Sequence, residues 1–278
     1  MLMMLGALNL LVWGVAGSFL GSFLNVCIYR MPREQSIVRP RSKCTACAHP
    51  IAWYDNIPVV SFLWLRGRCR HCHKRIALRY PVVELLTAAS TVAVTARFGP
   101  GPVGLVYVAF VCALIVASFI DLEFQIIPDE ISLGGLAVGV LLSLLIPSLH
   151  GTLSRLVALE RSVIGLLVGG GALYATGLVG DLLFRKESMG GGDIKLLAMA
   201  GSILGWKLVV VTFFIAPMIA LLPGLLVLLF KRSHVIPYGP FLSLGLVGAL
   251  FYGNEILRAS GVEESVRMLW ALYHQAPR

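Results

Sequence analysis

The sequence predicts an all-α membrane protein that crosses the bilayer about eight times. Of its 278 residues, 58% are hydrophobic and only 13% are charged, and the mean hydropathy is +0.85. This composition lies outside the range of soluble globular domains. Apolar stretches recur along the chain, and crossing a hydrocarbon core takes about 20 residues. We expect spans at 2–29, 82–98, 103–120, 131–149, 162–184, 194–205, 208–230 and 241–257.

The first span carries no charge, so it lacks the basic region of a cleavable signal peptide and should stay in the membrane. The second and third spans are separated by Gly-Pro-Gly-Pro, which predicts a tight reversal and therefore a helical hairpin. The sixth span is short and flanked by glycines. These limits divide the chain into a first span at 1–29, a polar segment at 30–80, a seven-span membrane domain at 81–258 and a tail at 259–278.

Lys and Arg residues set the expected orientation, because positive residues that flank spans stay on the cytoplasmic side. If the polar segment 30–80 is cytoplasmic, alternation of the spans places most of the 23 Lys and Arg residues on that side. The net charge of +9 then follows from topology. We therefore expect these residues to face a lipid bilayer and predict no nucleic-acid partner.

The polar segment holds four of the six cysteines in the pattern C-x2-C-x21-C-x2-C, at Cys44, Cys47, Cys69 and Cys72. Two such pairs can form two knuckles that close a tetrahedral thiolate site, so the spacing predicts structural zinc in a zinc-ribbon-like segment. Two disulfides or redox-active pairs are the alternatives, and a reducing cytoplasm disfavours the disulfides. His71 and His73 flank the last cysteine and are interpreted as solvated residues rather than ligands.

Ionisable groups near membrane depth are expensive and usually have a function. Asp121 follows an unbroken apolar run, and Asp193 follows three glycines that would let backbone and substrate approach closely. In the expected topology Asp121 ends an inward span and Asp193 begins an outward one, so both lie at the cytoplasmic face. Two close carboxyls share one proton, so one can act as a general base on water and the other as a general acid. This pair predicts peptide hydrolysis.

Other acidic residues have simpler interpretations. Asp129 follows a proline and precedes an apolar run, which is typical of a helix N-cap. Glu84 lies at a span end and is expected to pair with an arginine such as Arg79. Asp181 is interpreted as an interfacial residue, and Asp193 could itself be a cap.

The motifs around these residues resemble a known family. Asp121 upstream of the run Gly190, Gly191, Gly192 and Asp193 is similar to the two-aspartate GxGD pattern of intramembrane aspartyl proteases. Within that group the chain resembles the bacterial type IV prepilin peptidases. Besides the cysteine pairs, the matching blocks are GSFLNVCIYR at 21–30, WYDNIP at 53–58, RYPVVE at 79–84 and IPYGPF at 236–241.

The resemblance implies an enzyme of the bacterial inner membrane. It would cut the basic leader from type IV prepilins, or from the pseudopilins of type II secretion, at the cytoplasmic face. Asp121 and Asp193 would be the catalytic pair, with Gly190, Gly191 and Gly192 in the active-site loop. Lys195, one turn further, would either modulate the pair or anchor the helix end by snorkelling.

The resemblance also implies a second activity for chains that carry the cysteine segment. Such members transfer a methyl group from S-adenosylmethionine to the new amino terminus of the pilin. No glycine-rich fingerprint marks a site for the methyl donor. Asp55 and Asn56, in the block WYDNIP, are the candidates.

Three other readings stay open at the level of sequence. A transporter or channel can also have membrane carboxylates and glycine-broken helices, although no inverted repeat is visible here. A non-enzymatic assembly factor could use the zinc segment to bind partners, and its aspartates would then be replaceable. A peptidase without methyltransferase activity is the third.

Overall fold

The structure is a computed structural model that describes residues 2–186, 189–231 and 237–261. The predicted tail at 259–278 lies outside the described residues from position 262 onward. The chain divides into two compact units, residues 1–131 and 132–278. In the described ranges all regular secondary structure is helical, apart from two isolated β-bridges. The predicted all-α fold class is therefore confirmed.

Six helices in the described part of the chain are long and apolar enough to cross a membrane, rather than the eight that we predicted. They are α1 (Leu2–Arg30), α3 (Arg79–Phe98), α4 (Pro102–Phe124), α6 (Arg155–Phe184), α8 (Trp206–Lys231) and α9 (Gly239–Ala259). The two remaining predicted spans, 131–149 and 194–205, form the shorter helices α5 (Asp129–Leu145) and α7 (Gly191–Leu204). The 14 residues of α7 rise only about 21 Å, less than a hydrocarbon core of about 30 Å.

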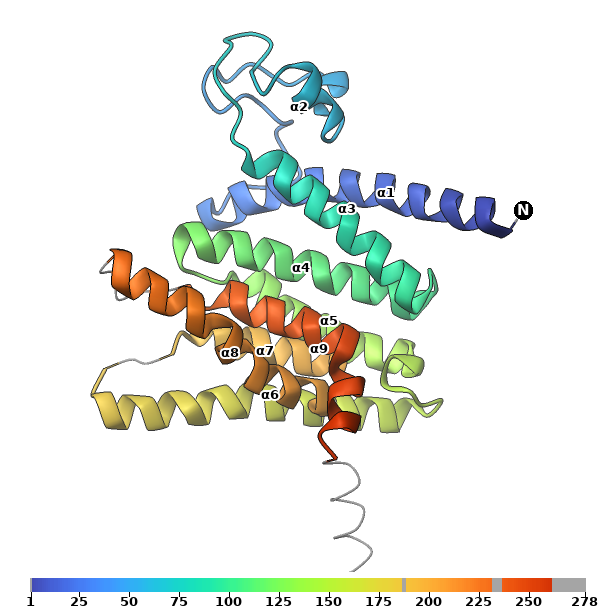
Figure 1. The fold of residues 1–278 in the computed structure, drawn as a ribbon, viewed down its shortest axis with the longest axis vertical. Helices are drawn as coiled ribbons and strands as arrows, with labels where there is room; N and C mark the ends of the chain where they lie inside the picture. The colour runs from blue at the N-terminus through green and yellow to red at the C-terminus, as the bar shows by residue number, and fades with distance from the viewer. Residues whose placement is uncertain (1, 187–188, 232–236, 262–278) are drawn as a thin grey trace, which may run out of the picture. The chain divides into compact units, whose positions relative to one another are not determined.

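The first unit consists of three packed helices and one polar segment. Figure 1 shows α1, α3 and α4 side by side, with the segment around α2 projecting from them. Between α1 and α3 the chain forms the short helices η1 (Met31–Arg33), η2 (Trp53–Asn56) and α2 (Val60–Trp64). From residue 34 to residue 78 only Pro58 and Ser61 are buried. This segment therefore has almost no apolar core of its own.

Helix α1 approaches α3 closely at two glycines. A Cβ atom added at Gly17 would lie 2.8 Å from the Cα of Ala88, and one added at Gly21 would lie 2.6 Å from the Cα of Glu84. Small residues at helix crossings allow such backbone contact in membrane proteins. Gly21, the first residue of the block GSFLNVCIYR, thus brings α1 against the backbone of Glu84.

We expect Gly21→Ala to destabilise the protein by about 1–3 kcal/mol, because the added methyl group forces two backbones apart. The melting temperature of the purified protein in detergent would report this change. The matched control is Gly171→Ala in α6, where an added Cβ atom meets nothing within 4 Å. An unchanged melting temperature for Gly21→Ala would contradict the close contact.

The second unit contains α5, η3 (Pro147–His150), α6, α7, α8 and α9. Helices α6 and α7 cross backbone to backbone, because a Cβ atom at Gly165 would lie 2.1 Å from the carbonyl oxygen of Gly201. One buried hydrogen bond reinforces this crossing: the hydroxyl of Ser162 donates to the carbonyl oxygen of Ser202 at 2.8 Å. This packing fixes α7, whose first turn carries Asp193.

Candidate functional site

Two similar knuckles hold the four cysteines of the polar segment. In the first, the N–H of Cys44 donates to the carbonyl oxygen of His49. The N–H of Ala48 donates to the carbonyl oxygen of Cys44. In the second, Cys69 and His73 make the equivalent bonds with Lys74 and Cys69. Ala48 and His73, each four residues after the first cysteine of a pair, have φ angles of 57° and 56°. Each knuckle closes on an isolated β-bridge, Lys43 with Pro50 and Arg68 with Arg75.

The four thiols lie together as a tetrahedral metal site requires. Their sulfur atoms are all within 4.8 Å of one another, and the Sγ atoms of Cys44 and Cys72 are 3.8 Å apart. Metal–sulfur bonds of about 2.3 Å in a tetrahedron put sulfur atoms about 3.8 Å apart. All four cysteines are free, which excludes the alternative of two disulfides here. The predicted cluster is therefore confirmed as one that could bind zinc.

Local groups favour the thiolate form that binds metal. A hydrogen bond from the backbone of Cys47 is the largest influence on Cys44, and it helps to lower the pKa of that thiol to about 6. A thiolate, not a thiol, is the metal ligand. The two histidines nearest the cluster stack on each other, because the rings of His49 and His71 have centroids 4.3 Å apart.

The turn that carries Asp55 is fixed at both sides. The guanidinium of Arg70, between the cysteines of the second knuckle, donates three hydrogen bonds of 2.6–3.1 Å to the Asp55 carboxylate. Asp55 in turn raises the pKa of Arg70. The Ser61 hydroxyl donates to the carbonyl oxygen of Tyr54 at 2.8 Å and accepts from the N–H of Ile57 at 3.1 Å. The cysteine cluster and the WYDNIP block are thus one connected structure.

Glu84 connects this segment to α3. Its carboxylate accepts a 2.7 Å hydrogen bond from the N–H of Val59. Val59 has φ 60° and ψ −48°, a conformation that is rare for a β-branched residue and costs about 1–3 kcal/mol. The N–H of Val60 donates to the carbonyl oxygen of Pro58 at 2.6 Å across this reversal.

Our prediction that Glu84 pairs with Arg79 is wrong, because Arg79 contacts Glu123 instead.

Asn25 connects α1 to the start of α3. Its side-chain nitrogen donates to the carbonyl oxygen of Tyr80 at 3.0 Å and to that of Gly21 at 3.3 Å. Both partners are acceptors, so these contacts identify the nitrogen and the oxygen of the amide. The oxygen is buried and has no hydrogen-bond partner.

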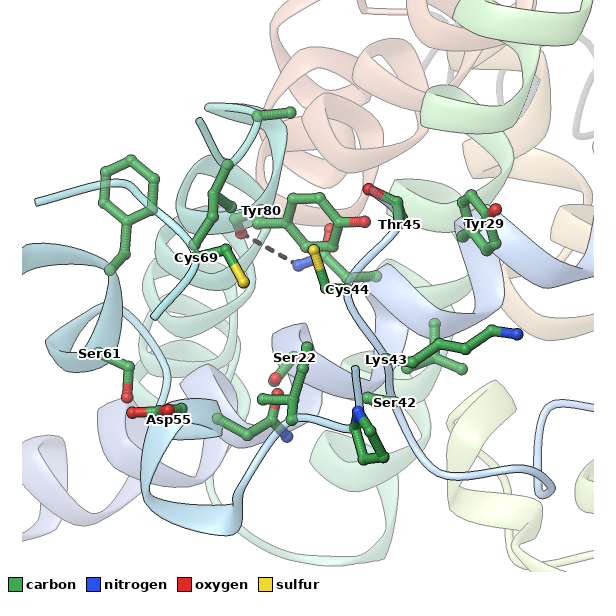
Figure 2. Close-up of a pocket in the computed structure, with 18 of the residues that line it drawn as sticks. Ser22, Tyr29, Ser42, Lys43, Cys44, Thr45, Asp55, Ser61, Cys69 and Tyr80 are labelled. Carbon is green, nitrogen blue, oxygen red and sulfur yellow. Dashed lines mark hydrogen bonds between the residues drawn. The ribbon is translucent and has the colours of Figure 1, made fainter. Parts of the chain in front are cut away.

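A cavity of about 1190 Å³ lies between the polar segment and the ends of α1 and α3, all within the first unit. Its volume is a little above the range of about 300–1,000 Å³ that is usual for small-molecule sites. Figure 2 shows Ser22 from α1 and Asp55 and Ser61 from the segment around the same space as Cys44 and Cys69. Both predicted cofactor candidates, Asp55 and Asn56, line this cavity.

Asp121 is buried in the last turn of α4. The helix ends because Gln125 takes a left-handed φ of 57°, and its N–H donates to the carbonyl oxygen of Asp121 at 2.9 Å. Two residues beyond Asp121, Glu123 forms ion pairs with Arg79 and Arg33. These exposed pairs contribute little energy individually, but they join the end of α4 to the polar segment and the start of α3.

Asp193 lies in the first turn of α7, where the helix dipole favours negative charge. Burial, and then the charge of Asp193, raise the pKa of Tyr238 to about 12, so the IPYGPF block has a residue near this carboxylate. The prediction of an active-site loop at 190–192 is wrong in part. Gly190 is the N-cap, whereas Gly191, Gly192 and Lys195 belong to α7, because glycine is tolerated at a cap and in a first turn.

The two aspartates belong to different units, and their pairing stays a prediction.

The sequence analysis did not predict that Ser22, Asn25 and Arg70 line the cavity. A single amide in the apolar run of α1 was the available signal for Asn25, because a buried amide needs partners.

Comparison with known proteins gives consistent matches along the chain. The profile of the bacterial peptidase A24 N-terminal domain matches residues 15–98, and that of the type IV leader peptidase family matches residues 108–225. A prepilin leader peptidase/N-methyltransferase of Aeromonas hydrophila is 36% identical over 266 residues, which cover 86% of this chain and 89% of that protein. Its namesake in Pseudomonas putida is 34% identical over 267 residues, covering 87% and 90%.

A third relative of the same name, from Myxococcus xanthus, is 39% identical over 215 residues, or 77% of this chain and 62% of that protein. No solved structure matches the chain. The chain belongs to the prepilin leader peptidase/N-methyltransferase family, and it is an integral membrane protein.

Proposed function

We propose that this protein removes the basic leader peptide from type IV prepilins or pseudopilins and then methylates the new amino terminus. The observation that carries the proposal is the match, over most of the chain, to relatives that are named for both activities. The bacterial peptidase A24 N-terminal domain matches residues 15–98, which contain the cysteine cluster and every residue that lines the cavity except Glu123.

Peptide hydrolysis is assigned to Asp121 and Asp193 at the cytoplasmic face of the bacterial inner membrane. The local environments support different roles for them. Asp193 begins a helix, where the dipole favours a negative charge, and Asp121 ends one, where the dipole opposes it. A carboxyl that keeps its proton and one that loses it are the acid and base that hydrolysis needs.

Methyl transfer is assigned to the cavity of the first unit. S-adenosylmethionine would supply a sulfonium methyl group there, and Asp55 and Asn56 would help to hold it. The basic groups of the lining suit the carboxylate of such a donor. Seven Lys and Arg residues line the cavity, of which Arg70 and Arg79 already form ion pairs within the protein: Arg30, Arg39, Lys43, Arg70, Lys74, Arg75 and Arg79.

A zinc ion in the four-cysteine cluster has a structural role in this proposal. Four protein ligands close the coordination shell and leave no open position for a substrate. Cys69 and Cys72 would hold the ion on either side of Arg70, whose guanidinium holds Asp55, so a bound ion would fix this knuckle. Zinc binding and the shape of the cavity wall are thereby coupled.

Co-expression with a type IV prepilin in a peptidase-null bacterium tests both activities at once. Mass spectrometry of the purified pilin should find its amino terminus without the leader and heavier by one methyl group. Cleavage without added mass would contradict the methyl-transfer part. The absence of cleavage for several pilins and pseudopilins, with the protein present in the membrane, would overturn the whole proposal.

A further inference from the structure

One residue that lines the cavity, Asn25, has a buried hydrogen-bond acceptor with no donor. Asn25 is only 3% exposed, and its side-chain oxygen has no partner. A buried acceptor left in this state costs about 1–3 kcal/mol. Asn25 lines the cavity, and its nitrogen is already committed to two carbonyl oxygens. An occupant of the cavity whose N–H bond reaches this oxygen would satisfy it.

A buried carboxylate lines the same cavity. Glu84 is 8% exposed and accepts hydrogen bonds from the N–H of Val59 and the hydroxyl of Ser22. A carboxylate has about four acceptor positions, so it can take a further donor. No arginine or lysine forms an ion pair with Glu84 among the described residues. A buried carboxylate of this kind favours a cationic occupant.

The distribution of charge in the cavity separates two kinds of ligand. Basic side chains outnumber acidic ones in the lining as a whole, which suits the carboxylate of a methyl donor. The acceptors Glu84 and Asn25 come instead from α3 and α1, on the side where Gly21 brings those two helices into contact. These two acceptors suit a small cation that has N–H donors.

We propose that Glu84 and Asn25 form the subsite for the amino group that is methylated, that is, for the free α-ammonium of the cleaved pilin. This inference rests on the proposed function and adds the location of its second substrate. S-adenosylmethionine also has an α-ammonium group, but a carboxylate is attached to the same carbon and would lie against the Glu84 carboxylate, whereas the pilin terminus has a neutral amide there. The unpaired Asn25 oxygen and the Glu84 carboxylate together therefore favour the pilin amine.

The same two residues account for the proton that methylation must remove. The ammonium gives one proton to the Glu84 carboxylate, and the nitrogen lone pair then attacks the methyl carbon of the sulfonium donor. The N–C bond forms as the C–S bond breaks, and the electron pair of that bond stays on sulfur as a thioether. Glu84 passes its proton to water.

The test measures methyl transfer by the purified full-length protein in detergent. The probes are radiolabelled S-adenosylmethionine and a synthetic peptide with the amino-terminal sequence of a mature type IV pilin. Glu84→Gln keeps an acceptor for the Val59 N–H but loses the charge, so KM for the peptide should rise by about tenfold or more. Asn25→Leu should raise the same KM. An N-acetylated peptide, which lacks the charge, should inhibit wild type poorly.

Thr91→Val is the matched control, because Thr91 is buried in the same helix and its hydroxyl has no hydrogen-bond partner. Its KM should equal that of wild type. The inference is overturned, and the proposed function stands, if wild type methylates and both cavity variants keep the wild-type KM. It is also overturned if Glu84→Gln weakens binding of S-adenosylmethionine, with or without an equal effect on S-adenosylhomocysteine, because Glu84 would then hold the sulfonium or the α-ammonium of the methyl donor. A wild type that methylates neither peptide nor pilin refutes the proposed methyl transfer itself.

Discussion

Asp121→Asn or Asp193→Asn is expected to slow leader cleavage by about a hundredfold or more, because each substitution removes one partner of general acid–base catalysis. An amide of the same shape cannot take a proton from water or give one to the leaving amine. The measurement is the rate of leader removal from a purified prepilin by each variant in detergent. Methylation of a pilin peptide that already lacks its leader should persist in both variants, since neither aspartate lines the cavity.

Asp181→Asn is the matched control for these substitutions, because it changes an exposed aspartate near the end of α6. It should cleave at the wild-type rate. If Asp121→Asn or Asp193→Asn also cleaves at that rate, the aspartyl mechanism is wrong and a non-enzymatic role becomes the better hypothesis.

Loss of the metal is expected to abolish methyl transfer and leave the membrane helices folded. The polar segment buries only Pro58 and Ser61 between residues 34 and 78, so it lacks the apolar core that folds most domains. Zinc binding contributes about 10–16 kcal/mol to the folding of small zinc modules. Without it, the second knuckle and Arg70 lose their fixed positions, and Asp55 loses its three hydrogen bonds.

The double variant Cys69→Ser with Cys72→Ser tests this expectation. Elemental analysis should find about one zinc per wild-type chain and almost none in the variant, and the variant should not methylate a pre-cleaved pilin peptide. Cys112→Ala, at a half-buried position in α4, is the control and should keep its zinc. Normal methylation by a zinc-free variant would show that the metal does not organise the cavity.

Much of the fold could be predicted because it depends on local patterns. Apolar runs located the eight longer helices, and only the length of α5 and α7 fell short of a full span. The spacing of the cysteines predicted their cluster, since two C-x2-C pairs in one short segment are typical of a four-cysteine metal site. Glycine was harder to interpret, because it suits both a loop and a helix start. Gly191 and Gly192 begin α7 rather than precede it.

The cavity could not be predicted because its contacts join residues far apart in sequence. Val59 and Glu84 are 25 positions apart, and Asn25 and Tyr80 are 55 apart. Glu84 follows Arg79 closely in the sequence, which favours an ion pair between them. In the structure Arg79 instead forms an ion pair with Glu123, 44 positions away. The positive φ of Val59 could not be predicted from the sequence either, because valine rarely adopts it.

The contacts of Glu123 bear on the order in which a pilin would be processed. Glu123 lines the cavity, and it lies in the same last turn of α4 as Asp121. In the proposed function, the same turn of α4 therefore contributes to the peptidase site through Asp121 and to the wall of the methylation cavity through Glu123, so a released amino terminus has a short way to go. Tethering of this kind raises the effective concentration of the intermediate. The enzyme would work processively, and pilins that are cut but not methylated would be scarce even when the methyl donor binds weakly.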